Sequence, residues 1–172
     1  MQQLCLTGAH AEALADRLFA ALNIRPVGLR VLPFHVDGAP RGRMLHLLPP
    51  PAPPALNDVP CQVLLAEGRC VSIPEALEHV AAPGLLAALR IQAPVLLSGL
   101  NADLLACPAF CDAVRTCIMS QHPVVITADK AAMQLLQSLV PEEKQVWFGV
   151  PDDDDAQAIL LESLIPEAAL RF

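Results

Sequence analysis

Four consecutive aspartates, Asp152, Asp153, Asp154 and Asp155, form the densest cluster of chemical groups in the sequence. Such carboxylates could hold a divalent cation. Consecutive side chains on a helix, however, diverge by about 100°, so they cannot all face one ion. Pro151 precedes the cluster, and acidic residues in a first turn complement the helix dipole. The pattern therefore favours a helix N-terminus over a metal site.

The six cysteines are the other groups that could bind a metal or carry out redox chemistry. They stand at positions 5, 61, 70, 107, 111 and 117. Cys107 and Cys111 could share a helix face, but a tetrahedral site requires two further ligands, usually a second close pair. This spacing favours reduced, largely buried thiols. We predict no metal site.

Polar residues that follow apolar runs are candidates for a ligand site. Asn101 and Asp103 follow one predicted strand, and Asp129 follows the next. The carboxyl ends of strands in an open α/β sheet are where ligands bind. These three residues are therefore a possible pocket edge, although Asp129 also fits a helix N-cap.

The composition of the 172-residue chain limits the classes of protein to which it can belong. Hydrophobic residues make up 54% and charged residues 17%, with a net charge of −7. The 11 lysines and arginines form no basic stripe, so we expect no nucleic-acid binding. No apolar run approaches the roughly 18 residues of a membrane helix. The first residues lack the basic start of a signal peptide, so we expect a cytoplasmic protein.

The first half of the chain predicts a strand, a helix and two hairpins. An apolar run at residues 3–7 ends in Gly8, and an amphipathic helix follows at 9–22. Asp37-Gly38 joins strands at 27–32 and 44–48, where Pro33 predicts an edge or an early stop. Residues 49–60 are rich in proline and predict a rigid surface loop. A second hairpin is predicted at 62–66 and 69–72.

The second half predicts alternating helices and strands. Ser72 and Glu75 fit a capping box that starts a helix, which Pro83-Gly84 should interrupt. Strands are expected at 94–97, 123–126 and 145–148, and helices at 108–120, 130–139 and 153–164. This alternation indicates βαβ units in one domain spanning residues 1–172. The expected class is α/β, with a mostly parallel sheet covered by helices on both faces and a hairpin insertion near residues 27–72.

The junction between the first strand and helix is where a phosphate-binding loop would lie. Such a loop follows the pattern Gly-x-x-x-x-Gly-Lys-Ser/Thr, in which backbone N–H groups surround phosphate, the lysine reaches the outer phosphates and the hydroxyl ligates magnesium. Only the first glycine is retained in the corresponding residues, which are Gly8, Ala9, His10, Ala11, Glu12, Ala13, Leu14 and Ala15. His10 could bind an anion or act as a base, but the sequence shows no nearby Ser or Cys nucleophile and favours an exposed first-turn residue.

Several segments together resemble the small P-loop nucleoside-triphosphatase family first known from thermophiles, whose members look like nucleotide kinases. The similar segments are Leu6-Thr7-Gly8, the hairpin from Gly28-Leu29 through Arg41-Gly42, Val95-Leu-Leu-Ser98-Gly99, Cys107-Pro108-Ala109-Phe110, and Pro123-Val-Val-Ile-Thr127-Ala-Asp129. They extend over about residues 3–165. The resemblance implies a three-layer P-loop NTPase-like fold and an ancestral site for nucleotide and magnesium.

The sequence departs from this family at the residues that would carry its chemistry. The Walker B aspartate and glutamate correspond to Ser98 and Gly99, which lack the carboxylates that would help hold magnesium and position an attacking water. The family's Thr-x-Glu-x-Arg pattern corresponds loosely to Val31, Pro33 and His35. Glu12 also places a negative charge within the would-be phosphate loop, where it would repel phosphate.

Two functional hypotheses follow from these departures. In the first, the chain is a degenerate member of this fold that has lost catalysis, needs no cofactor and acts as an interaction or regulatory protein with an unidentified partner. In the second, it still binds a nucleotide or another anionic small molecule without a well-formed magnesium site. Retention of Gly8 beside a helix N-terminus motivates the second hypothesis.

Overall fold

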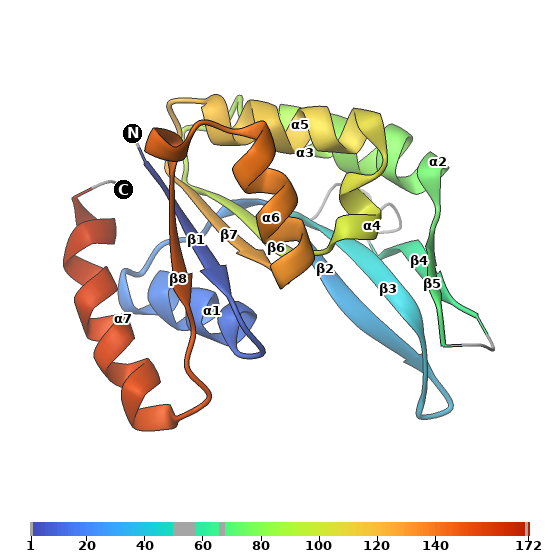
Figure 1. Ribbon diagram of the computed structural model, residues 1–172. Helices are drawn as coiled ribbons and strands as arrows, with labels where there is room; N and C mark the ends of the chain where they lie inside the picture. The colour runs from blue at the N-terminus through green and yellow to red at the C-terminus, as the bar shows by residue number, and fades with distance from the viewer. Residues whose placement is uncertain (1, 50–57, 66–67, 171) are drawn as a thin grey trace.

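The computed structural model describes residues 2–49, 58–65, 68–170 and 172. Eight strands form one mixed sheet in the order β5-β4-β3-β2-β6-β7-β1-β8, and helices lie on both of its faces (Figure 1). This architecture confirms the predicted α/β fold with a mostly parallel sheet and an inserted hairpin region.

The parallel half of the sheet contains five strands. These are β1 (Gln3–Thr7), β2 (Val27–Val36), β6 (Val95–Leu100), β7 (Val124–Ala128) and β8 (Gln145–Gly149). Strand β1 pairs in parallel with β7 on one side and β8 on the other, and β6 pairs in parallel with β2 and β7. The carboxyl ends of all five strands therefore meet at one edge of the sheet.

The antiparallel half contains the two predicted hairpins. It extends β2 by β3 (Ala39–Leu48), β4 (Val59–Leu64) and β5 (Cys70–Ser72). Asp37 and Gly38, with φ of 51° and 77°, form the first turn. The proline-rich loop predicted at 49–60 lies mostly outside the described residues. Val59 and Pro60 belong to β4, so the loop ends earlier than predicted.

The early stop predicted at Pro33 is wrong, because β2 continues to Val36. Pairing between β2 and β6 covers only Val27, Gly28, Leu29 and Arg30. Beyond them β2 pairs with β3 alone and is an edge on its other side. A residue without an N–H is tolerated at such an edge, which is the other outcome that Pro33 predicted.

The helix that follows β5 is not interrupted at Pro83-Gly84, contrary to the prediction. Helices α2 (Pro74–Ala76) and α3 (Ala82–Ala88) are joined by η2 (Leu77–Ala81), a π-helical turn. The N–H of Ala82 bonds to the carbonyl of Leu77, five residues back. Such a turn widens the helix next to the proline and lets the chain continue past its missing donor.

The capping box predicted for Ser72 and Glu75 is also absent. The N-cap residue of α2 is Ile73, which makes no side-chain cap. The Ser72 hydroxyl instead donates to the carbonyl oxygen of Asp103, at 3.0 Å. A tertiary contact from β5 to the segment after β6 has therefore replaced a local cap.

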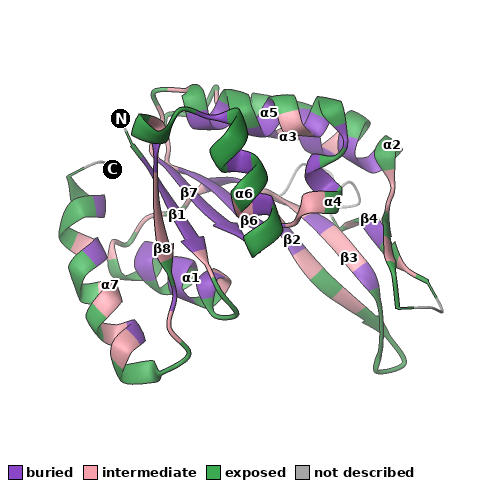
Figure 2. Ribbon diagram, in the orientation of Figure 1, coloured by how far each residue is buried: buried purple, intermediate pink, exposed green. Residues whose placement is uncertain are grey.

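Two hydrophobic cores lie on opposite faces of the sheet (Figure 2). Helices α1 (Ala11–Ala21) and α7 (Asp154–Ala169) cover one face, with Leu14 and Leu18 buried between α1 and the sheet. Helices α3, α5 (Pro108–Met119) and α6 (Lys130–Leu139) cover the other, where Phe110 and Ile118 are buried. We call these the α1-side core and the α5-side core.

The four aspartates occupy a helix N-terminus, as predicted. The carboxylate of Asp153 accepts a hydrogen bond from the N–H of Ala156 at 2.8 Å, and α7 continues to Ala169, five residues beyond the predicted end at Leu164.

All six cysteines are free thiols. Among the described residues, no three His, Cys, Asp or Glu side chains are placed to hold a metal ion. Within the same residues, no helix has the length and apolar character required to cross a membrane.

Candidate functional site

A cavity of about 390 Å³ opens at the carboxyl ends of the parallel strands, the edge where α/β sheets bind ligands. Its walls come from the β1–α1 junction, β3, the end of β6 and the β7–α6 junction. The lining residues are Thr7, Gly8, Ala9, Ala11, Glu12, Arg43, Gly99, Leu100, Thr127, Ala128, Asp129 and Lys130.

The connection between β1 and α1 is only three residues long, because α1 already begins at Ala11. The N–H of Ala11 donates to the carbonyl of Gly8 at 3.2 Å, and that of Leu14 donates to His10 at 3.0 Å. Ala11 to Ala15 are therefore helical and do not form a wrapping loop.

The eight positions predicted from the phosphate-loop pattern have different environments. Gly8, Ala9, Ala11 and Glu12 line the cavity. His10 is exposed, with its Nε2 atom 3.9 Å from a carboxylate oxygen of Asp152, and Ala13 is exposed as well. Leu14 and Ala15 are fully buried in the α1-side core, so their side chains cannot reach a ligand.

Gly8 is required by the packing of its backbone. Its φ is +125°, and a Cβ atom added there would lie 2.8 Å from the carbonyl oxygen of Val150. Val150 is held in this position by its N–H, which donates to the Thr7 carbonyl at 2.7 Å. The glycine is thus explained by the contact between β1 and the segment after β8, without any phosphate.

Ser98 and Gly99 lie near the end of β6, where the register of its pairing with β7 shifts. Both are buried. The Thr127 hydroxyl accepts from the N–H of Gly99 at 2.8 Å and lies 3.1 Å from the Ser98 hydroxyl. The two hydroxyl groups therefore satisfy each other's hydrogen-bonding capacity, and the bond from Gly99 to Thr127 holds the backbone in place where the register shifts.

No side chain fits at position 99. Gly99 has a φ of +78°, and an added Cβ atom would overlap the carbonyl oxygen of Val31. It would also lie 3.2 Å from Nη2 of Arg43 and 3.3 Å from Oε1 of Glu12. The space into which an acidic residue here would extend is therefore filled by the backbone of β2 and by two charged side chains.

These two side chains, Glu12 and Arg43, meet inside the cavity. Nη2 of Arg43 lies 3.6 Å from Oε1 of Glu12 and donates to the carbonyl of Val31 at 3.3 Å. Burial raises the pKa of the Glu12 carboxyl above its ordinary value, and the positive charge of Arg43 opposes that shift. An ion pair thus joins α1 to the β2–β3 hairpin inside the cavity.

The sequence alone does not point to Arg43 or Thr127 as members of this site. Arg43 lies on an antiparallel strand, and its distance from α1 depends on the register between β2 and β3. Lys130 directly follows Asp129, so the strand-end rule that selected Asp129 could also have found Lys130.

Of the three residues predicted at a pocket edge, only Asp129 lines the cavity. Its carboxylate accepts from the N–H of Ala132 at 2.7 Å and so caps α6, the second role predicted for it. Asn101 caps α4 (Ala102–Leu105) and exchanges two side-chain hydrogen bonds with Gln62, at 2.8 and 3.2 Å. Asp103 is exposed beside Ser72.

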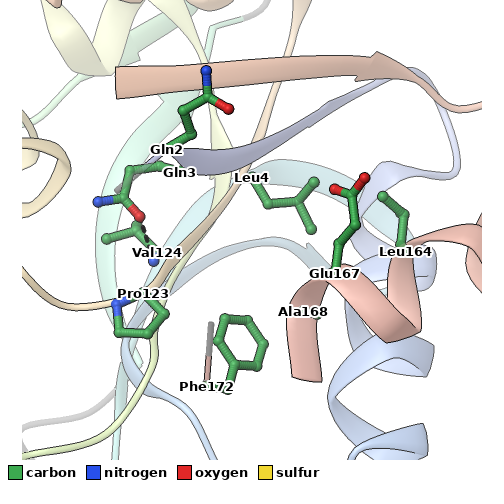
Figure 3. Close-up of a pocket in the computed structure, with 9 residues that line it drawn as sticks. All are labelled: Gln2, Gln3, Leu4, Pro123, Val124, Leu164, Glu167, Ala168 and Phe172. Atoms are coloured by element: carbon green, nitrogen blue, oxygen red, sulfur yellow. Dashed lines mark hydrogen bonds between the residues drawn. The ribbon is translucent and has the colours of Figure 1, made fainter. Parts of the chain in front are cut away.

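A second hollow, at the amino ends of β1 and β7 and so at the opposite edge from the cavity, is too small to be a ligand site. It lies beside Gln3, Leu4, Val124 and Phe172 and has a volume of about 10 Å³, room for about one water molecule (Figure 3). The Gln3 side chain is fully used there, since it donates to the carbonyl of Ile118 at 3.0 Å and accepts from the N–H of Val124 at 2.8 Å.

Comparisons with known proteins support the fold and leave the activity open. No protein-family profile and no curated protein matches the chain. The crystal structure of THEP1 from the hyperthermophile Aquifex aeolicus is similar, with a TM-score of 0.68 and 15% sequence identity, over 96% of this chain and 98% of that one. The chain therefore has a P-loop NTPase-like fold.

Proposed function

We propose that this P-loop NTPase-like domain does not hydrolyse nucleoside triphosphates and acts as an interaction or regulatory protein. The observation that carries the proposal is the Glu12–Arg43 ion pair inside the cavity, which occupies the space beside Gly99. We place the protein in the cytoplasm, in keeping with its six free thiols.

The β1–α1 junction supports a loss of phosphate binding. A phosphate loop surrounds its ligand with successive backbone N–H groups and adds a lysine. Here the connection is three residues long, and the residue at the lysine position, Leu14, lies in the α1-side core. The Glu12 carboxylate adds repulsion toward a phosphate in the same cavity.

The end of β6 supports a loss of magnesium binding and water activation. Magnesium prefers carboxylate oxygens in octahedral geometry, often one or two of them. The hydroxyl of Ser98 is committed to Thr127, and position 99 has no room for a side chain. Two carboxylates do line the cavity, but Glu12 is paired with Arg43 and Asp129 caps α6. On these grounds we propose that the residues present do not fit a magnesium–nucleotide complex and that the protein uses no cofactor.

A hydrolysis assay tests this proposal. Wild-type protein and the Arg43→Ala variant would be incubated with ATP or GTP and magnesium, and released phosphate would be measured. We expect the same background rate of phosphate release for both proteins, because hydrolysis by a contaminating enzyme would not depend on residue 43. Magnesium-dependent turnover by the wild type that Arg43→Ala abolishes would show that the domain is an enzyme. Substitution of Gly8 is a poor control, because its contact with Val150 makes a folding defect the expected result.

The cavity favours a second candidate function, the binding of an anionic small molecule such as a nucleotide. A volume of about 390 Å³ lies within the usual range for ligand pockets, and Arg43 and Lys130 supply positive charge. Calorimetry with ATP, ADP, GTP and pyrophosphate, on wild type and on Arg43→Ala, tests this function. The absence of heat from every compound at millimolar concentration would exclude it.

A further inference from the structure

Strand β8 leaves one end of the sheet open for pairing. It is the last strand in the order, and Figure 1 shows it at the end of the sheet opposite the β2–β5 hairpins. Its packing partners in the described part of the chain are mainly β1 and η3 (Glu142–Lys144), a short turn that precedes it. No helix is among these main partners. The Gln145 side chain nevertheless donates to the carbonyls of Leu136 and Val140 at the end of α6, so the first residue of β8 is buried and the later ones are half-buried or exposed.

This edge has none of the features by which proteins usually prevent pairing. Its sequence, Gln-Val-Trp-Phe-Gly, contains neither a charged residue nor a proline, and it pairs with β1 over all five residues without a bulge. Proteins commonly protect an edge with lysine, proline, a bulge or a very short strand. The opposite edge, β5, is only three residues long and follows Arg69.

The hydrogen-bond pattern shows which backbone groups are directed outward. The N–H of Val150 donates to Thr7, so even-numbered residues of this segment direct their N–H groups toward β1. By the alternation of a parallel ladder, the N–H groups of Trp147 and Gly149 point away from the sheet. Gly149 is exposed, so a partner strand can approach its outward N–H. A Cβ atom added to Gly149 would point to a face of the sheet and meet nothing within 4 Å.

The charges at both ends of β8 restrict the partner. Exposed Glu142 and Glu143 precede the strand, with Lys144 between them and β8, and four exposed aspartates at positions 152–155 follow it. A second copy paired antiparallel about Trp147 would bring these acidic ends together, which costs free energy. A segment with basic residues at both ends would be attracted by both clusters.

We propose that the edge of β8 binds an extended peptide segment that has an uncharged, β-prone centre and lysine or arginine at both ends. The segment adds a strand to the sheet, with main-chain hydrogen bonds to Trp147 and Gly149 and with its basic ends near the two acidic clusters. This surface is separate from the cavity. It gives the proposed interaction role a partner of defined chemistry.

The single tryptophan of the chain, Trp147, lies on this edge and reports binding directly. The probe is a synthetic peptide with alternating threonine and valine at its centre and two lysines at each end. We expect its titration to change tryptophan fluorescence, with an affinity that falls as salt increases. A peptide with glutamates in place of the lysines should bind at least about tenfold more weakly.

Two substitutions at Gly149 test the geometry. Gly149→Pro removes the outward N–H and leaves the inward bond of Val150 in place, whereas Gly149→Ala keeps the donor. We expect Gly149→Pro to weaken peptide binding at least about tenfold and Gly149→Ala to leave it unchanged. Should Gly149→Pro fail to fold, Glu142→Gln/Glu143→Gln still tests the proposal, because it should weaken the lysine peptide alone.

Three results would overturn the proposal: no fluorescence change at millimolar peptide, equal binding of the lysine and glutamate peptides, or a dimer in sedimentation that Gly149→Pro converts to monomer. The last result would show that the edge pairs with a second copy. None of these measurements depends on the cavity, so failure here and failure of the proposed loss of hydrolysis are distinguishable.

Discussion

At the scale of single residues, the cavity is defined by two side chains that satisfy each other. Glu12 comes from the first turn of α1 and Arg43 from β3, and their charges meet 3.6 Å apart. Arg43 would attract an anion, and Glu12 both repels that anion and pairs with Arg43. The anion affinity of the cavity therefore depends on the charge of Glu12.

Glu12→Gln should raise the affinity of the cavity for inorganic anions. The substitution keeps the size of the side chain, removes the repulsion and releases Arg43 from its ion pair. We expect pyrophosphate to bind at least about tenfold more tightly, which corresponds to about 1.4 kcal/mol. Calorimetry measures the change. Asp16→Asn, which breaks the Asp16–Arg30 pair outside the cavity on the same helix, is the matched control. Because Asp16 and Arg30 also act on Glu12 electrostatically, it should change binding much less than Glu12→Gln does.

The pKa of Glu12 makes the same interaction dependent on pH. Because burial raises this pKa, Glu12 takes up a proton as the pH falls through a value above its ordinary range. Sulfate, whose charge does not change over this range, should then bind the wild type more tightly at lower pH. Asp129 also lines the cavity, so Glu12→Gln supplies the reference, and its affinity should vary less. Equal pH dependence in both proteins would contradict the assignment to Glu12.

The raised pKa also has a consequence for stability. The folded state binds the proton of Glu12 more tightly than the unfolded state does. The associated stability is present below the ordinary pKa of glutamate and is lost as the pH rises through the folded value. Glu12→Gln should remove this loss, and urea unfolding at several pH values would detect it.

Gly99→Ala should destabilise the fold by about 2 kcal/mol or more, because the added methyl group overlaps the Val31 carbonyl and the backbone has a positive φ. Gly38→Ala is a matched control, since its φ of +77° is almost the same as the +78° of Gly99 and it has nothing within 4 Å. Urea unfolding compares the two. Equal losses would mean that backbone strain alone, without the close packing around Gly99, sets the cost.

At the scale of secondary-structure elements, contacts between distant segments decide where local rules fail. The capping box at Ser72 was predicted from residues three apart, but the Ser72 hydroxyl bonds to Asp103, far along the chain. Asn101 was predicted as a ligand residue and instead links the segment after β6 to Gln62 of β4. In both cases the partner is set by how β4 and β5 pack against α4, which no local pattern specifies.

Local patterns did predict most element positions. The limits of α6 are those predicted, and Asp129 and Asp153 cap their helices. The βαβ alternation correctly indicated a parallel sheet, because a buried strand and an amphipathic helix have distinct apolar periods. The candidate site was only partly predicted. Gly8 and Glu12 follow from chain order, whereas Arg43 reaches the cavity through strand register.

The role assigned to Asn101 leads to a prediction for α4 and the β4–β5 hairpin. Asn101→Ala removes both the helix cap and the exchange with Gln62 and should cost about 2–3 kcal/mol. Asn101→Asp keeps an oxygen that caps Leu104 but loses the donor to Gln62, so its cost should be smaller. Chemical denaturation of the two variants measures both costs. A larger loss for Asn101→Asp would contradict the capping role.

At the scale of the whole molecule, the sheet both joins and separates the two cores. Strand β6 contributes Leu96 to the α1-side core and Val95 and Leu97 to the α5-side core, and β7 contributes Val125 to the first and Val124 and Ile126 to the second. Because both cores use residues of the same strands, unfolding of one core would also disturb the other. The described residues should therefore unfold as one cooperative unit.

This shared sheet predicts one unfolding transition with additive effects from substitutions on its two faces. Leu18→Ala, in the α1-side core, should cost about 2–5 kcal/mol, and Ile118→Val, in the α5-side core, about 0.5–1.5 kcal/mol. Because the sheet lies between them, the double variant should lose the sum to within about 0.5 kcal/mol. Urea unfolding followed by Trp147 fluorescence and by far-ultraviolet circular dichroism should give coincident transitions. Separate transitions for the two probes would instead mean that the α1–α7 layer unfolds independently of the rest of the sheet.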